Sequence, residues 1–339
     1  MKEFGWFAVI AGAVMLEVLT APGTPLSGQG WKLSRSGAPG KVHFTMERRR
    51  PGNREINSSD VPLANFRGFS LDMLDHSGPA KFEYVHDAGS LLCEGRIAWG
   101  RGSGSFTLKP NPAFVSELNG LGFATPREDE LFMLMMANIN LEFVREVHSA
   151  GIGSTLRDLI DLGTHGVTLD YIQGVNHAGY RNLRAQDYID LRDHGVKPRF
   201  IEDLELAGYE IPARQVIDLR DHGVDSNFVR DLQVYGLRPP APELVAMHDH
   251  GVTPGYLHGL RDAGFGALSA DEIIGLRDHG VPADFAVEAR SLGFHFTPRE
   301  LIDLRDHGVD AKYLRTVRDS GMQNLTGPQI TQLRDHGVN

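Results

Sequence analysis

The stretch Leu301-Ile302-Asp303-Leu304-Arg305-Asp306-His307-Gly308-Val309 decides the fold of most of this chain, because versions of it recur at regular intervals. The His-Gly-Val triplet occurs seven times, and successive copies begin 28 or 29 residues apart. The histidines of these copies are His165, His194, His222, His250, His279, His307 and His336. A period of this length is typical of a solenoid, in which each repeat packs only on its neighbours.

Other positions recur in step with the histidine. A leucine or methionine stands three residues before it, and an aromatic residue and a glycine follow six and fourteen residues after the first six copies. Glycine ends helices because it readily adopts the left-handed conformation, and the capping box Thr297-Pro298-Arg299-Glu300 marks a helix start. Each repeat therefore predicts two short helices, which are stable only when stacked. We predict an all-α solenoid of helix-pair repeats over residues 127–339, with about seven repeats and a terminal half repeat.

Residues 41–125 show the alternation of apolar and polar residues that is typical of β-strands. We expect strands at 41–50, 81–86, 90–99 and 105–109, and short helices at 70–75 and 112–118. The glycine-rich run at 100–104 joins two expected strands and has no helix after it, so it predicts a hairpin turn rather than a phosphate loop. The expected fold class is an α+β unit, a small antiparallel sheet with short helices, followed by the solenoid. No catalytic constellation is recognisable in this unit.

The N-terminal segment points to export. Residues 4–16 form an apolar run that is too short to span a bilayer comfortably but fits the core of a secretory signal. We predict a signal peptide, or an uncleaved membrane anchor, over residues 1–21 and a flexible spacer over residues 22–40. The protein is therefore expected in the periplasm or outside the cell, with membrane contact only through this segment.

Charge and missing motifs argue against several classes of function. Residues 125–339 carry 21 Lys and Arg against 33 Asp and Glu, and an acidic surface repels phosphate, so no nucleic-acid partner is expected. The sequence lacks the His-Glu-x-x-His, Gly-x-Ser-x-Gly and Walker-type signatures. Cys93, the single cysteine, is expected in the core. We therefore expect no enzyme activity and no cofactor.

The candidate site comes from the repeated polar positions. Five of the histidines follow an Arg-Asp pair, which predicts a binding surface on one face of the array. Its residues are Arg192, Asp193, Arg220, Asp221, Arg277, Asp278, Arg305 and Asp306. A structural interpretation has the histidine at a helix end and Arg pairing with Asp between repeats. The alternative is metal binding.

The metal alternative would use histidines with neighbouring carboxylates as ligands. The candidate ligands are His222, His248, His250, His279 and His307. A metal site needs ligands that converge on one point, whereas these histidines mostly recur one repeat apart, so the pattern favours the structural interpretation.

Two features together resemble a known family. One is the set of His-Gly-Val repeats with Leu-Arg-Asp before them and Leu-Gly-Phe or Ala-Gly-Tyr closing the units. The other is Gly102-Ser103-Gly104-Ser105-Phe106-Thr107-Leu108, which leads to Pro110-Asn111-Pro112-Ala113-Phe114. Over residues 40–339 the chain resembles the C-terminal extracytoplasmic region attached to some bacterial membrane metallopeptidases of the β-lactam-sensor (antirepressor) type.

The resemblance transfers no catalytic residue, because the sequence contains neither the zinc motif nor the multi-span membrane region of those peptidases. What it implies is a module of the bacterial envelope that senses or binds. The expected function is therefore a non-enzymatic protein-interaction or sensing module, with a protein or peptide partner in the envelope.

Overall fold

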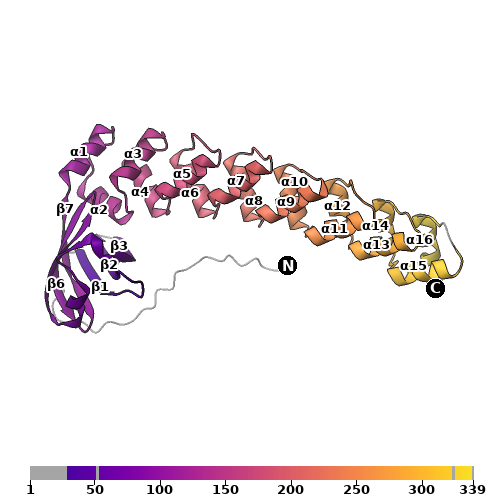
Figure 1. Cartoon of the computed structure of the whole chain (residues 1–339), viewed down its shortest axis with the longest axis horizontal. Helices are drawn as coiled ribbons and strands as arrows, with labels where there is room; N and C mark the ends of the chain where they lie inside the picture. Colours follow the sequence, from indigo (N-terminus) through magenta and orange to yellow (C-terminus); the bar gives the residue numbers. More distant parts are fainter. Residues whose placement is uncertain (1–28, 51–52, 323–324, 338–339) are drawn as a thin grey trace. The chain divides into compact units, whose positions relative to one another are not determined.

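The computed structural model of the protein describes residues 29–50, 53–322 and 325–337. The chain divides into two compact units, and the division falls between Pro112 and Ala113. The first unit is a curled antiparallel sheet, and the second is a succession of short helices (Figure 1). The predicted fold class is therefore confirmed.

The sheet of the first unit contains seven antiparallel strands among the described residues, in the spatial order β3-β2-β1-β7-β6-β5-β4. The strands are β1 (Gln29–Arg35), β2 (Lys41–Arg50), β3 (Asn53–Pro62), β4 (Phe66–Arg67), β5 (Gly78–His86), β6 (Gly89–Ala98) and β7 (Arg101–Pro110). Two short 3-10 helices, η1 (Leu63–Asn65) and η2 (Leu71–Asp75), lie on either side of β4 in the chain. The strands expected at 41–50, 81–86, 90–99 and 105–109 correspond to β2, β5, β6 and β7.

Aromatic side chains form the core on one face of this sheet. Phe44, Phe66 and Phe82 are each less than 8% exposed, and the centroid of the Phe66 ring lies 5.3 Å from that of Phe44 and 5.8 Å from that of Phe82. Because successive side chains of a strand point to opposite faces, His43 and Thr45 lie on the outer face of β2. The sheet therefore has one apolar and one polar face.

Three strands were not expected from the sequence, namely β1, β3 and the two-residue strand β4. The prediction of a flexible spacer over residues 22–40 is wrong for Gln29–Arg35, which form β1 between β2 and β7. Trp31 and Leu33 point into the core from this strand. Strand β3 is a sheet edge whose exposed residues are mostly polar, so it lacks the apolar alternation that identifies a half-buried strand.

Cys93, in β6, is fully buried. Burial raises the pKa of its thiol well above the ordinary value, so the side chain stays protonated and unreactive at neutral pH. The expectation that Cys93 is a core residue is confirmed.

The second unit begins with α1, so the boundary expected near residue 125 moves to residue 112. Phe114 and Leu118 of α1 are fully buried, and Glu117 forms an ion pair with Arg145 of α3. The helices are α1 (Pro112–Gly120), α2 (Glu128–Met136), α3 (Leu141–Ser149), α4 (Leu156–Thr164), α5 (Leu169–His177), α6 (Ala185–Asp193), α7 (Pro198–Leu206), α8 (Ala213–Asp221), α9 (Ser226–Tyr235), α10 (Ala241–Asp249), α11 (Pro254–Asp262), α12 (Ala270–Asp278), α13 (Ala283–Ser291), α14 (Pro298–Asp306), α15 (Ala311–Asp319) and α16 (Gly327–Asp335).

Each repeat contributes one even-numbered and one odd-numbered helix. From α2 to α16 each even-numbered helix contacts the next even-numbered one, and from α5 to α15 the odd-numbered helices do the same. The leucine of the repeated motif is fully buried, as at Leu219 and Leu276, so it lines a continuous apolar stripe between the two rows. The glycine after the histidine has positive φ, 70° at Gly308, and this conformation ends the even-numbered helix.

Capping boxes set the starts of several even-numbered helices, and that of α14 also joins two repeats. Glu300 accepts hydrogen bonds from the Thr297 N–H and hydroxyl at 2.9 Å, and from the Gly327 N–H of the next repeat at 3.2 Å. The hydrogen bond from the Thr297 backbone is the largest of the effects that hold the pKa of Glu300 below its ordinary value. The Thr326 box uses Gln329 in the same way, with a neutral amide.

We expect Glu300→Ala to lower the free energy of unfolding by about 1 kcal/mol at neutral pH, the usual loss for a helix cap. Because the folded-state pKa of Glu300 is depressed, its contribution is present above the unfolded-state pKa and disappears as pH falls through the folded value. Glu300→Gln is expected to keep most of the cap, as Gln329 does, and to lose this pH dependence. Urea unfolding of all three proteins at neutral and acidic pH tests this, and an unchanged pH dependence in Glu300→Gln would contradict it.

Within residues 29–50, 53–322 and 325–337, no helix combines the length and the apolar character needed to cross a membrane. The predicted signal peptide or anchor, residues 1–21, lies outside the described residues.

Candidate binding surface of the repeat array

A row of His–Asp pairs joins successive repeats. In each pair the histidine Nδ1 lies 2.6–2.9 Å from a carboxylate oxygen of the next repeat. The pairs are His165–Asp193, His194–Asp221, His222–Asp249, His250–Asp278, His279–Asp306 and His307–Asp335. Because an ionised carboxylate only accepts hydrogen bonds, the ring N–H of the histidine is the donor. The side chains of both residues are nearly half exposed in each pair.

The predicted pairing of Arg with Asp between repeats is wrong. The aspartate pairs with the histidine, and the arginine lies over the aromatic ring of the preceding repeat, 4.8–5.5 Å from its centroid. These contacts are Arg192–Tyr171, Arg220–Phe200, Arg277–Tyr256, Arg305–Phe285 and Arg334–Tyr313. A cation over a ring face is attracted by its quadrupole, and the planar guanidinium also stacks on it. We call the His–Asp pairs and these Arg–aromatic contacts the inter-repeat ladder.

All eight residues of the predicted binding surface belong to the inter-repeat ladder. Asp193, Asp221, Asp278 and Asp306 pair with histidines, and Arg192, Arg220, Arg277 and Arg305 cover aromatic rings. Arg220 and Arg305 also donate to the carbonyls of Val224 and Val309 in their own repeats. A partner that bound these side chains would have to compete with contacts that hold the repeats together.

The histidines of the metal alternative are also occupied. His222, His250, His279 and His307 each face one carboxylate, and His248 instead packs edge-on against Phe228, with ring centroids 5.4 Å apart. Among the residues that the structure describes, no three His, Cys, Asp or Glu side chains converge in a way that could hold a metal ion. The geometry therefore gives the metal hypothesis no ligand set.

The array also contains an open groove of about 340 Å³ between α9 and α11. The buried side chains of Tyr235 and Leu257 form its floor, and Asp231, Val234, His258 and Arg261 line its sides. The Tyr235 hydroxyl donates to the Phe265 carbonyl, so this residue presents its ring rather than a free hydroxyl. We call this feature the α9–α11 groove.

A departure from the repeat pattern accompanies the groove at Gly255, the second residue of α11. The other repeats carry bulkier polar residues at this position, which lies five residues after the histidine. They are Asp170, Arg199, Asn227, Asp284 and Lys312. A Cβ at Gly255 would have no neighbour within 4 Å, so the space above it is open.

Exposed apolar side chains lie beside the groove and in the repeat before it. Val234 of α9 is 66% exposed and Leu206 of α7 is 81% exposed, and both stand twelve residues after the histidine of their repeat. The other repeats have His177, Asp262, Ser291 and Asp319 at this position. Isolated exposed apolar residues are common, but two at equivalent positions of contacting helices form a short apolar strip.

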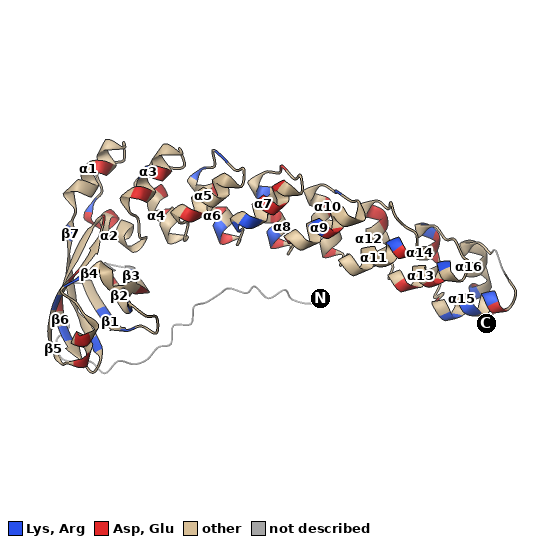
Figure 2. Ribbon diagram, in the orientation of Figure 1, with Lys and Arg blue, Asp and Glu red and all other residues tan. Residues whose placement is uncertain are grey.

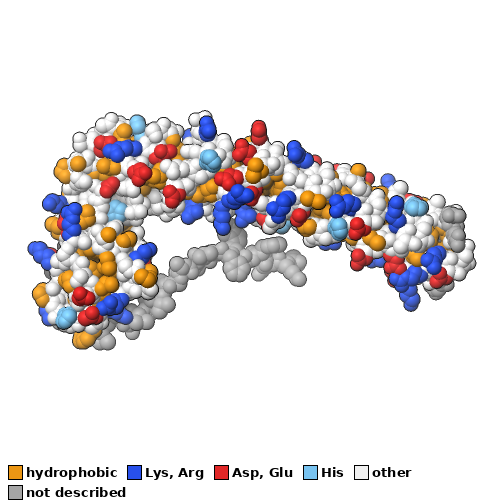
Figure 3. All heavy atoms as spheres, viewed as in Figure 1, with side chains coloured by type: hydrophobic (Ala, Val, Ile, Leu, Met, Phe, Trp, Pro, Cys, Tyr) orange, Lys and Arg blue, Asp and Glu red, His pale blue; other side chains and the backbone are white. Residues whose placement is uncertain are grey.

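Charged groups flank this strip. Arg261 donates to the Val234 carbonyl at 3.4 Å and to Nδ1 of His258 at 3.0 Å, and Asp231 lies on the opposite helix of the groove. Acidic and basic residues are distributed along the whole array (Figure 2), and apolar patches lie between them on the face seen in Figure 3. The groove thus combines an apolar floor with charges of both signs at its edges.

Sequence reasoning missed the groove because it searched for positions that the repeats share. The groove is instead marked by positions at which one or two repeats differ from the rest, namely residues 206, 234 and 255.

Fold and surface together define the chain as an α/α repeat protein that carries a curled β-sheet unit. No protein-family model, curated protein or solved structure matches it.

Proposed function

We propose that the repeat array is a non-enzymatic binding or sensing module that holds an extended peptide segment of an envelope protein in the α9–α11 groove. The observation that carries the proposal is the coincidence of three departures from the repeat pattern, at Leu206, Val234 and Gly255. Residues that only stack repeats would be expected to follow the pattern, as the inter-repeat ladder largely does. A local departure that opens a groove and exposes apolar atoms suits a ligand instead.

Size and chemistry favour a peptide. A volume of about 340 Å³ is at the lower end of the range for small-ligand sites, so the groove suits one or two side chains rather than a large ligand. The apolar floor of Tyr235 and Leu257 suits an aliphatic or aromatic side chain. Asp231 on one side and Arg261 on the other can pair with charged residues that flank it in the ligand.

The envelope location is part of the proposal. It is supported by the apolar run at residues 4–16 and by the resemblance to extracytoplasmic regions of membrane peptidases. The excess of Asp and Glu in residues 125–339 supports a peptide rather than a nucleic acid as the ligand.

Gly255→Lys should block the groove without harming the fold. The new side chain finds open space, α15 already carries Lys312 at the equivalent position, and lysine has a higher helix propensity than glycine. We expect peptides selected on the full chain from a display library to bind Gly255→Lys with an affinity lower by about tenfold or more, which corresponds to about 1.4 kcal/mol. Val234→Asp should weaken the same peptides by removing an apolar contact.

Gly266→Lys is the matched control. It adds the same charge to the loop after α11, where a Cβ also meets nothing within 4 Å, but it does not line the groove. Selected peptides should bind this variant as they bind the unchanged protein. The proposal is wrong if no peptide is enriched, or if the enriched peptides bind Gly255→Lys with unchanged affinity.

A further inference from the structure

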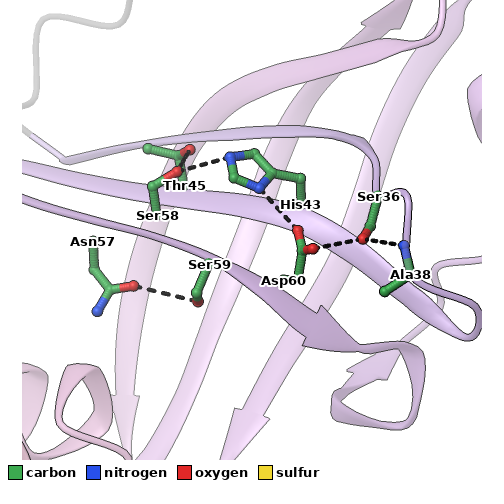
Figure 4. Close-up of polar contacts among 8 residues, drawn as sticks. All are labelled: Ser36, Ala38, His43, Thr45, Asn57, Ser58, Ser59 and Asp60. Atoms are coloured by element: carbon green, nitrogen blue, oxygen red, sulfur yellow. Dashed lines mark hydrogen bonds and ion pairs between the residues drawn. The ribbon is translucent and has the colours of Figure 1, made fainter. Parts of the chain in front are cut away.

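The outer face of β2 and β3 carries a chain of hydrogen bonds that joins a serine, a histidine and an aspartate (Figure 4). Ser58 Oγ lies 2.9 Å from Nε2 of His43, and Nδ1 of the same ring lies 3.0 Å from Oδ1 of Asp60. The serine and the carboxylate therefore contact opposite nitrogens of one imidazole. This is the connectivity by which a Ser-His-Asp triad activates its nucleophile, and such triads are recognised by geometry rather than by order in the chain.

The charge of Asp60 fixes the direction of these hydrogen bonds. Hydrogen bonds from Ser36 and then from His43 hold the pKa of Asp60 below its ordinary value, so the side chain is a carboxylate at neutral pH. Ser36 Oγ, 2.7 Å from Oδ2, and Nδ1–H of His43 must then both donate to it. In the neutral ring this leaves Nε2 as the acceptor, and the Ser58 hydroxyl donates to it.

The sheet register holds these groups in place. His43 lies directly opposite Asp60, and Thr45 lies directly opposite Ser58, so His43 and Ser58 are diagonal neighbours on the same face. Thr45 Oγ1 is 2.8 Å from Ser58 Oγ. Ser36 also accepts a hydrogen bond from the Ala38 N–H at 3.0 Å, which ties it to the turn before β2.

We propose that Ser58 is a reactive serine, with His43 as its general base and Asp60 as the positioning residue, and that it takes an acyl group from activated esters. This inference goes beyond the proposed function, because it concerns the sheet unit and not the array. Ser58 and Asp60 are exposed and His43 is partly exposed, so a reagent can reach the serine.

The chemical step balances within these groups. Ser58 Oγ attacks the ester carbonyl carbon while its proton moves to Nε2 of His43, and the carbonyl oxygen becomes an oxyanion. The Thr45 hydroxyl, next to Ser58 Oγ, can turn to donate to that oxyanion. The carbon–oxygen bond to the leaving alcohol breaks, the alcohol takes the proton from Nε2, and an acyl-serine remains. Water then attacks the acyl carbon and gives a proton to Nε2 of His43; the bond to Ser58 Oγ breaks, Oγ takes that proton back, and the carboxylic acid leaves.

The open position of the site sets its substrate class. General-base assistance contributes about 10²–10⁴ in rate, which is enough to make a serine reactive towards good leaving groups. One hydroxyl stabilises an exposed oxyanion less than hydrogen-bond donors do in a water-excluded site, because water screens the electrostatic interaction. Aryl esters and fluorophosphonates are therefore the expected reagents, and amides are not.

The test is labelling of the full chain with a fluorophosphonate probe, followed by peptide mapping. Ser59, the next residue, is the internal reference, because its hydroxyl contacts only the Asn57 side chain among the hydrogen bonds drawn in Figure 4. We expect Ser58 to be labelled at least about 100-fold faster than Ser59, in line with general-base assistance. His43→Gln should remove this difference, and Asp60→Asn should reduce it by about tenfold or more.

Ser59→Ala is the matched control and should leave the labelling of Ser58 unchanged. Because unfolding would also separate Ser58 from His43 and equalise the two serines, each variant is first shown to keep the buried-tryptophan fluorescence of Trp31. Equal labelling of the two serines, or an unchanged rate at Ser58 in His43→Gln, would overturn the proposal. The hydrogen bonds would then be cross-strand pairing alone.

Discussion

Gly104→Ala is expected to cost about 3 kcal/mol or more in the free energy of unfolding of the sheet unit, at or beyond the upper end for overpacking in a well-packed region. Gly104 in β7 lies directly opposite Gly95 in β6. A Cβ at Gly104 would come within 2.0 Å of the Glu94 carbonyl oxygen and 2.6 Å of the Gly95 Cα. Both are backbone atoms of the neighbouring strand, so neither can move without disturbing the ladder of hydrogen bonds.

Urea unfolding followed by tryptophan fluorescence measures this effect, since Trp31 is almost fully buried in the core of the sheet. Gly78→Ala is the matched control, because Gly78 is also a strand glycine of this unit but a Cβ there meets nothing within 4 Å. Its stability should stay within about 0.5 kcal/mol of the unchanged protein. Equal stability of the two variants would show that the close pairing of Gly95 and Gly104 relaxes at little cost.

Leu276→Ala is expected to destabilise the array by about 2–5 kcal/mol, through the lost burial and the cavity that remains. Leu276 of α12 is fully buried and lies in the apolar stripe between the two rows of helices. The effect should be largest near α12, because each repeat depends on its immediate neighbours. Far-UV circular dichroism during urea unfolding gives the total loss, and hydrogen exchange gives its location.

Leu206→Ala removes the same atoms from a side chain that is 81% exposed. Its effect on stability should be within about 0.5 kcal/mol, as for most surface substitutions. Similar losses for the two leucine variants would contradict the assignment of the core stripe. The Leu206 variant also bears on the proposed function, because it shortens the apolar strip beside the α9–α11 groove without unfolding the array.

The helices of the array could be predicted because the sequence repeats. The same leucine, aromatic and glycine positions return in each period, so each copy supports the assignment of the others. Strands β2, β5, β6 and β7 could be predicted from alternation and turn glycines. Strand β3 could not, since an edge strand with few apolar residues shows little of the alternation on which such a prediction depends.

Missing β3 also concealed the polar network of the sheet. The proximity of Ser58 to His43 depends on the register that places Thr45 opposite Ser58, and no register can be assigned to a strand that is not predicted. In the array the repeat pattern is compatible with a structural role for the repeated Arg and Asp, but it does not give their partners. Each arginine stacks on an aromatic ring of the preceding repeat that lies 20 or 21 residues earlier, and this contact depends on the angle between successive repeats rather than on spacing alone.

From His165 to Asp335 the inter-repeat ladder gives the junctions complementary ends, with a histidine on one repeat and an aspartate on the next. His194 meets Asp221 as His222 meets Asp249, so loss of one period would bring Asp249 to His194 with the same chemistry. A coding segment of 28 or 29 codons can thus be deleted or duplicated, and the repeats that become neighbours still form a His–Asp pair. Unequal recombination can add or remove a copy without creating a junction that is foreign to the protein, and the number of repeats that precede the α9–α11 groove can change one repeat at a time.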